Sequence, residues 1–115
     1  MTQRTDRVAD LLRAELAEII RQELRDPRIG LATVSSLSVS RDLGHAEVLV
    51  SVLGGDDEAR EQSVAVLERA KGHIRRLLAG RVRLRTVPEL NFRLDRGAEH
   101  SQRISEILEN LHRGD

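Results

Sequence analysis

A change in the spacing of apolar residues constrains the fold of this chain more than any other feature. From Val8 to Leu24, apolar residues recur every three or four positions, which predicts an amphipathic helix from Thr5 to about Arg25. We expect the Thr5 hydroxyl to cap the first turn and Asp26-Pro27 to stop the helix, since proline disfavours helical geometry at the residue before it. The apolar stripe consists of Val8, Leu11, Leu12, Leu16, Ile19, Ile20 and Leu24.

Beyond Gly30 the apolar spacing changes to two, which is the period of a half-buried strand. Residues 31–39 alternate in two halves, but Val34 and Leu37 lie three positions apart, so we expect a β-bulge near Ser35-Ser36. Residues 40–44 form the predicted hairpin turn. The inward residues of the second strand are Ala46, Val48, Val50 and Val52.

Gly54-Gly55 separates the second strand from another helical pattern. Asp56 and Asp57 stand where acidic side chains cap a helix N-terminus. The pattern passes through Ala70-Lys71-Gly72, and a glycine within a helix costs about 1 kcal/mol relative to alanine, so we expect a bend or a close approach there. We expect Gly80 to end the second half. The stripe consists of Ala59, Val66, Leu67, Ala70, Ile74, Leu77 and Leu78.

The remaining elements complete an α+β domain. Leu90, Phe92 and Leu94 alternate as a third strand after Pro88, and apolar residues at helical spacing predict a C-terminal helix over about 98–112. The predicted order is helix, strand, strand, bent helix, strand, helix, with the helices packed on a three-stranded sheet. At 115 residues we expect one domain spanning 1–115, with a core of about 5–96.

Composition narrows the functional classes. The chain has no cysteine, which excludes a disulfide framework, a thiolate zinc site and a cysteine nucleophile. It shows neither the apolar run of a signal peptide nor a stretch long enough to span a bilayer, so we expect a cytoplasmic protein without a membrane partner. Phe92 is the only aromatic residue, whereas single-strand binders hold bases by stacking on aromatic rings. We therefore expect a nucleic acid to be gripped by its backbone or its shape.

Charge is sorted along the chain, although 19 Lys and Arg balance 19 Asp and Glu overall. Residues 69–88 contain seven Lys or Arg, one His and no acidic residue. This window carries +7, against −5 for residues 1–68 and −2 for residues 89–115. A cationic patch on a neutral protein can hold polyphosphate through a local field. Because the window brackets the glycine-containing bend, we favour a binding site over an ordinary solvated helix face.

The bend predicts a cradle for a phosphodiester backbone. At about 100° per residue, Gly72 lies nearly opposite the apolar stripe, so bare backbone faces solvent. Guanidinium forks and the amides of a restarted helix are the expected donors to phosphate. Packing accommodation is the alternative explanation for Gly72. The flanking cations are Arg69, His73 and Arg76 on one side and Lys71 and Arg75 on the other.

Not all of these residues are equally strong candidates for RNA binding. Lys71, Arg75 and Arg76 are the first choices for phosphate contacts, and Ala70 and Gly72 are expected to shape the backbone. The further candidates, Arg69, His73, Arg81, Arg83 and Arg85, would extend the track. For the last three, the alternative is an ordinary exposed strand or loop.

An ordered set of motifs carries a family resemblance. The set comprises Glu23-Leu24-Arg25-Asp26-Pro27-Arg28, Val50-Ser51-Val52-Leu53-Gly54, Ala70-Lys71-Gly72, Ile74-Arg75-Arg76, Arg83-Leu84-Arg85 and Val87-Pro88-Glu89-Leu90-Asn91-Phe92. In this order, and along nearly its whole length, the chain resembles the bacterial ribosome-binding factor A (RbfA) family. The resemblance implies a type II KH-like fold with an Ala-x-Gly kink in place of the Gly-x-x-Gly loop, which this sequence lacks.

The resemblance also implies a function. It implies binding to the immature small (30S) ribosomal subunit and its 16S rRNA, and help in late maturation near the RNA's 5′ end, without catalysis. It suggests ribosomal proteins and assembly GTPases as further partners, and we expect a monomer. Members of the family often carry a longer basic C-terminal tail, whereas this chain ends in Leu111-His112-Arg113-Gly114-Asp115, with little charge.

Other chemistry has little support. The residue types of a catalytic triad occur at Asp95, His100 and Ser101, but the sequence has no nucleophile elbow. The four histidines lack metal-ligand spacing, and Gly54-Gly55 is not followed by the Gly-Lys-Ser/Thr of a P-loop. We therefore expect no enzyme activity, no metal and no cofactor. Two alternatives stay open: a protein adaptor that docks an acidic partner, and a general KH-like RNA chaperone.

Overall fold

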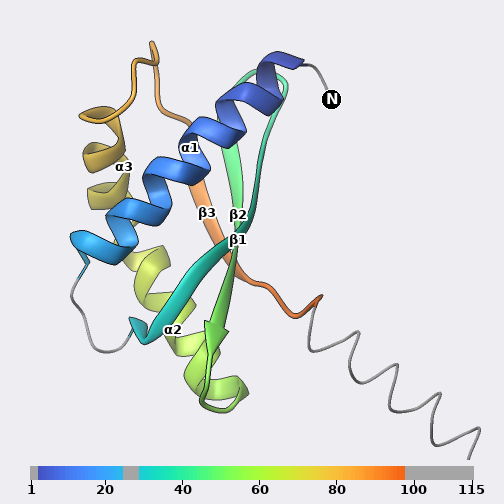
Figure 1. The fold of residues 1–115 in the computed structure, drawn as a ribbon, viewed down its shortest axis with the longest axis vertical. Coiled ribbons are helices and arrows are strands. Elements are labelled where there is room, and N and C mark those ends of the chain that lie inside the picture. Colours follow the sequence, from blue (N-terminus) through green and yellow to red (C-terminus); the bar gives the residue numbers. More distant parts are fainter. Residues whose placement is uncertain (1–2, 25–28, 98–115) are drawn as a thin grey trace, which may run out of the picture.

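The computed structural model describes residues 3–24 and 29–97, which form three helices and a three-stranded sheet (Figure 1). In chain order the elements are α1 (Gln3–Gln22), β1 (Leu31–Val39), β2 (His45–Leu53), α2 (Asp57–Arg69), α3 (Lys71–Ala79) and β3 (Glu89–Leu94). The predicted order of elements is confirmed up to residue 97. The predicted C-terminal helix lies outside the described residues.

The stripe of α1 packs on the sheet, with Leu12, Leu16 and Ile19 fully buried. Leu11, at 42% exposed, lies at the margin of this stripe and not within it. The prediction that Thr5 caps the helix is wrong. The helix already includes Gln3, and Thr5 lies in its first turn with only 3% of its surface exposed, whereas a cap precedes the first helical residue. The predicted stop at residues 26–27 lies outside the described part of the chain.

The sheet has the order β1-β2-β3, with β1 antiparallel and β3 parallel to β2. Parallel neighbours need a long crossover, and α2 and α3 together form it. The pairing of β1 with β2 shifts between Val34 and Ser36, where the Ser35 hydroxyl donates to the Leu49 carbonyl at 3.1 Å. The predicted β-bulge is therefore confirmed.

One face of the sheet carries the core. Ala46, Val48 and Val50 are fully buried and alternate with partly exposed residues, and they join the buried residues of all three helices in a single cluster. The helices therefore cover the same face. Phe92 is 5% exposed within this cluster, so the single aromatic ring is not offered to a nucleic-acid base.

The start of α2 is set by local signals. Gly54 and Gly55 have φ of 82° and 73°, a region that glycine enters without strain, and they turn the chain out of β2. Asp56 then caps the helix, its carboxylate accepting the Ala59 amide at 2.8 Å. Ala59 is exposed, so the buried stripe begins after it, at Ser63 and Val64.

Candidate nucleic-acid interface

The long helical pattern breaks at one residue. Ala70 ends α2 and precedes α3, with φ −89° and ψ 2°, and its amide is shared between the carbonyls of Val66 and Leu67 at 3.1 Å each. The Ala70 carbonyl accepts the Ile74 amide at 3.0 Å, so the second helix starts at once. The predicted bend is confirmed, but the break falls on Ala70, and Gly72 lies inside α3. We call residues 69–73 the kink.

Gly72 faces solvent, as predicted. It is exposed, and a Cβ atom added to it would meet no heavy atom within 4 Å. Packing accommodation therefore does not explain this glycine. What remains is a strip of uncovered backbone on the outer side of the kink, which a phosphodiester chain can approach more closely than it could approach a side chain.

Lys71 forms an ion pair with Glu68 at the surface. Its Nζ atom lies 2.8 Å from Glu68 Oε1, and Glu68 Oε2 accepts the Phe92 amide of β3 at 2.7 Å. The bond to Glu68 and the negative charge of that carboxylate raise the pKa of Lys71 above its ordinary value. Glu68 thus connects α2, α3 and β3, and the Lys71 charge is already compensated.

Arg75 also makes an internal contact. Its Nε and Nη2 atoms donate to the Val87 carbonyl at 3.0 and 2.7 Å. This carbonyl belongs to the segment between α3 and β3, so the guanidinium fixes that segment against the helix. Lys71 and Arg75, the cations predicted on the second side of the cradle, are therefore both bonded to groups of the protein.

Arg81 is the third cation of the window with protein partners. Its guanidinium lies 3.5 Å from Glu15 Oε2 and 3.3 Å from Glu23 Oε1, both on or next to α1. The contacts connect the end of α3 to α1 across the surface.

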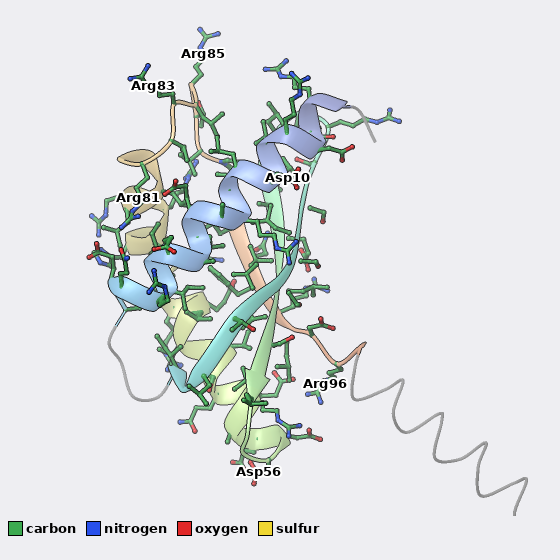
Figure 2. All side chains as sticks on the ribbon, in the orientation of Figure 1. Asp10, Asp56, Arg81, Arg83, Arg85 and Arg96 are labelled. Atoms are coloured by element: carbon green, nitrogen blue, oxygen red, sulfur yellow. The ribbon has the colours of Figure 1, made fainter. Side chains whose placement is uncertain are left out.

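The remaining cations face solvent. Within residues 3–24 and 29–97 they form no ion pair or side-chain hydrogen bond, and they are Arg69, His73, Arg76, Arg83 and Arg85. Figure 2 shows Arg83 and Arg85 at the outer tip of the loop after α3, pointing away from the helices. The acidic N-cap Asp56 lies at the opposite end of the molecule in the same view.

The loop that carries Arg83 and Arg85 alternates between anchoring and exposed residues. Val82 is 8% exposed and Leu84 packs against the core, whereas Arg83 and Arg85 are exposed. Val87 closes the segment, with 7% of its surface exposed. We call residues 81–87 the arginine loop. In the sequence, apolar and basic residues alternate from 82 to 85, and this pattern indicates a loop with one buried and one exposed side.

Two other kinds of site have no support among the described residues. No group of three His, Asp or Glu within the described ranges is arranged to hold a metal ion. No helix in the same part of the chain is long and apolar enough to cross a membrane.

The kink and the motifs around it agree with a known family. The family model described as Ribosome-binding factor A matches residues 4–108. The chain belongs to the ribosome-binding factor A family. A relative of this name from Alkalilimnicola ehrlichii is 50% identical over 106 residues, covering 92% of this chain and 82% of the relative. Another from Desulforamulus reducens is 39% identical over 111 residues, covering 96% and 92%.

Solved structures of ribosome-binding factor A share the fold. The crystal structure from Thermus thermophilus is 33% identical, with a TM-score of 0.71 over 81% of this chain and 97% of that one. The solution structure of a putative ribosome binding factor A from Thermotoga maritima is 37% identical, with a TM-score of 0.72 over 83% and 90%. A Thermus thermophilus homology model fitted into a cryo-EM map of a 30S–RbfA complex is 35% identical, with a TM-score of 0.65 over 77% and 92%. The fold is type II KH-like, as predicted.

Proposed function

We propose that this protein is an assembly factor that binds the immature small (30S) ribosomal subunit and its 16S rRNA in the cytoplasm, and that it assists late maturation, including processing of the 5′ end. Family membership supports the proposal, and so does the likeness to a protein fitted into a map of a 30S complex. The observation that carries it is the set of solvent-facing cations around α3, beside the uncovered backbone at Gly72.

The proposed mechanism uses binding energy alone. By holding one arrangement of the RNA more tightly than its competitors, the protein shifts a folding equilibrium and leaves when that arrangement is no longer available. Arg69, His73, Arg76, Arg83 and Arg85 are the proposed phosphate contacts in the present side-chain arrangement. The protein is proposed to act as a monomer, without a catalytic step, and ribosomal proteins and assembly GTPases are its proposed neighbours on the particle.

Co-sedimentation with immature small subunits tests the proposal. We expect the folded triple variant Arg76→Gln/Arg83→Gln/Arg85→Gln to associate at least about 1,000-fold more weakly, because contacts to charged groups contribute about 1.5–3 kcal/mol each. The triple variant Arg13→Gln/Arg21→Gln/Arg93→Gln loses the same charge from other surfaces and should associate normally. Equal association of both variants would argue against this binding face.

Two further comparisons separate the alternatives. A protein adaptor would lose its ligand to an unrelated acidic peptide, whereas the proposed factor should resist such competition. A general RNA chaperone would bind arbitrary RNA as tightly as the immature subunit. In cells, the first triple variant should accumulate 16S rRNA with an unprocessed 5′ end, and normal processing in those cells would refute the maturation role.

A further inference from the structure

We infer that the arginine loop is a phosphate-binding element that is already in its binding conformation before RNA arrives. Two arginines hold the loop in place without contacting the RNA themselves. Arg83 and Arg85 are the contacting residues, and Arg75 and Arg81 are positioning residues. The inference rests on the proposed function, because it assumes an RNA ligand. It changes the assignment of Arg75, which by sequence alone was among the strongest candidates for phosphate contact.

The start of the loop is fixed on two sides. The amides of Arg81 and Val82 donate to the Leu78 carbonyl at 2.9 and 3.0 Å, which continues the last turn of α3 into the loop. The Arg81 side chain then reaches Glu15 and Glu23. These two carboxylates compensate the Arg81 charge, so a phosphate would have to displace them to use it.

The end of the loop is fixed by Arg75. Two donors of one guanidinium converge on the Val87 carbonyl, and Val87 and the following Pro88 are buried. The Glu89 amide donates to the Gly44 carbonyl at 2.9 Å, so the loop passes directly into the sheet. Arg75 uses its Nε and one Nη2 donor for this contact, so the side-on fork of its guanidinium is occupied by the protein and only the remaining Nη donors are left.

Between the fixed ends, buried and exposed residues alternate. Val82 and Leu84 pack inward, and Arg83 and Arg85 both extend outward from the tip of the loop (Figure 2). A loop already held in its binding conformation avoids the ordering cost that a flexible basic segment would incur on binding. Two exposed guanidinium groups on a fixed support can each donate to a phosphodiester group.

The loop and the kink lie at opposite ends of α3, and one strand can contact both. Nine helical residues rise about 13 Å, while a stacked strand advances about 3.4 Å per nucleotide. A run of about four nucleotides therefore spans the length of α3, and a longer run is needed to reach Arg83 and Arg85 at the tip of the loop. Arg76 lies between the two ends and is the natural intermediate contact.

The salt dependence of binding to immature small subunits distinguishes contacting from positioning residues. Each phosphate contact contributes about 0.7–0.9 to the slope of log affinity against log salt concentration. Arg83→Gln and Arg85→Gln should each reduce the slope by that amount. Arg75→Gln and Arg81→Gln should weaken binding several-fold without changing the slope, and should speed hydrogen exchange at the amides of residues 82–87. Arg93→Gln, which removes an exposed charge paired with Glu47, is the matched control and should change neither quantity.

A double-mutant cycle tests whether the positioning residues act through the loop. In an Arg83→Gln/Arg85→Gln background, Arg75→Gln should cause no further loss of affinity, because the groups that it positions are gone. A slope reduced by Arg75→Gln as much as by Arg83→Gln would make Arg75 a contact and overturn the inference. The inference would also be overturned if Arg75→Gln changed neither the affinity nor the hydrogen exchange of the amides of residues 82–87. A wild-type protein whose association with the subunit is insensitive to salt would instead contradict the proposed function.

Discussion

The two ends of α3 carry similar numbers of basic residues but use them differently. At the kink, Glu68 holds the backbone of β3 and compensates Lys71, and bare backbone at Gly72 lies beside the solvent-facing Arg69 and His73. At the arginine loop, Arg81 bonds to α1 and the residue after it while Arg83 and Arg85 face solvent. The kink therefore contributes uncovered backbone beside two solvent-facing basic residues, whereas the loop contributes charge alone. A dense run of cations in a sequence overstates how many remain available for a ligand, because some of them build the support for the others.

The largest effect on stability is expected from removing the support of the kink. Glu68→Ala leaves the Phe92 amide without its acceptor in a residue that is 5% exposed, and this should lower the free energy of unfolding by about 2 kcal/mol. The lost ion pair with Lys71 adds little, since both side chains are more than a third exposed. Urea denaturation measures the effect. Glu68→Gln keeps an acceptor and should recover most of the stability; equal destabilisation by both changes would count against this role of the hydrogen bond.

A smaller loss of stability, with a larger effect on function, is expected at the loop. Val82→Ala removes two buried methyl groups and should cost about 1.5 kcal/mol. By loosening the support of Arg83, it should also weaken association with the immature subunit. Arg83→Ala should weaken association as well but leave the denaturation midpoint in place. If Val82→Ala were destabilised yet bound normally, the loop would not need its inner anchor.

Gly72→Ala should separate stability from binding at the kink. The added methyl group meets no atom, and alanine is the better helix former, so we expect the protein to be more stable by about 0.5–1 kcal/mol. The same methyl would stand where the RNA backbone is proposed to approach, so subunit association should fall. Thermal denaturation and co-sedimentation measure the two effects. A stabilised variant with full association would place the RNA strand away from Gly72.

The smallest effect concerns acid stability, which should come from the ends of the strands and not from α3. The Ser35 hydroxyl and the Gly97 amide hold the pKa of Asp95 below its ordinary value of 3.8, and Ser40 and Gly44 do the same for Asp42. These carboxylates are ionised and stabilising above that value, and the stabilisation is lost as pH falls through their lowered pKa values. Asp95→Asn should therefore be slightly less stable than wild type at neutral pH. The difference between them should shrink as pH falls below 3.8 and through the lowered pKa of Asp95. A constant difference across this range would mean that the charge of Asp95 does not matter.

Much of the fold could be predicted because its signals are local. The strand alternation located the bulge at Ser35-Ser36, and Asp56 marked the start of α2. The exception was Thr5, where a residue type suited to capping lies in the first turn of α1, on its buried side. Local chemistry alone did not show how early that helix begins.

The candidate site was predicted less completely, for a reason that Arg75 illustrates. Its acceptor is a backbone carbonyl 12 positions later. Every residue has such a carbonyl, so the sequence does not show which one accepts the bond. Arg81 meets Glu23, which lies 58 positions earlier, just after another helix. Neither pairing follows from residue type or spacing, so both arginines were counted among the RNA-binding candidates.

By itself, the amino-acid sequence determined the order of helices and strands, the place of the bend, and the gathering of positive charge between residues 69 and 88. These properties depend on apolar periodicity, turn residues and composition within short stretches of chain. Only the tertiary structure decided which cations are left for a ligand. Packing brings α1, α3 and the arginine loop together, and a charged side chain that meets a carboxylate or carbonyl there is held by the protein, whereas one that meets only water is free to bind.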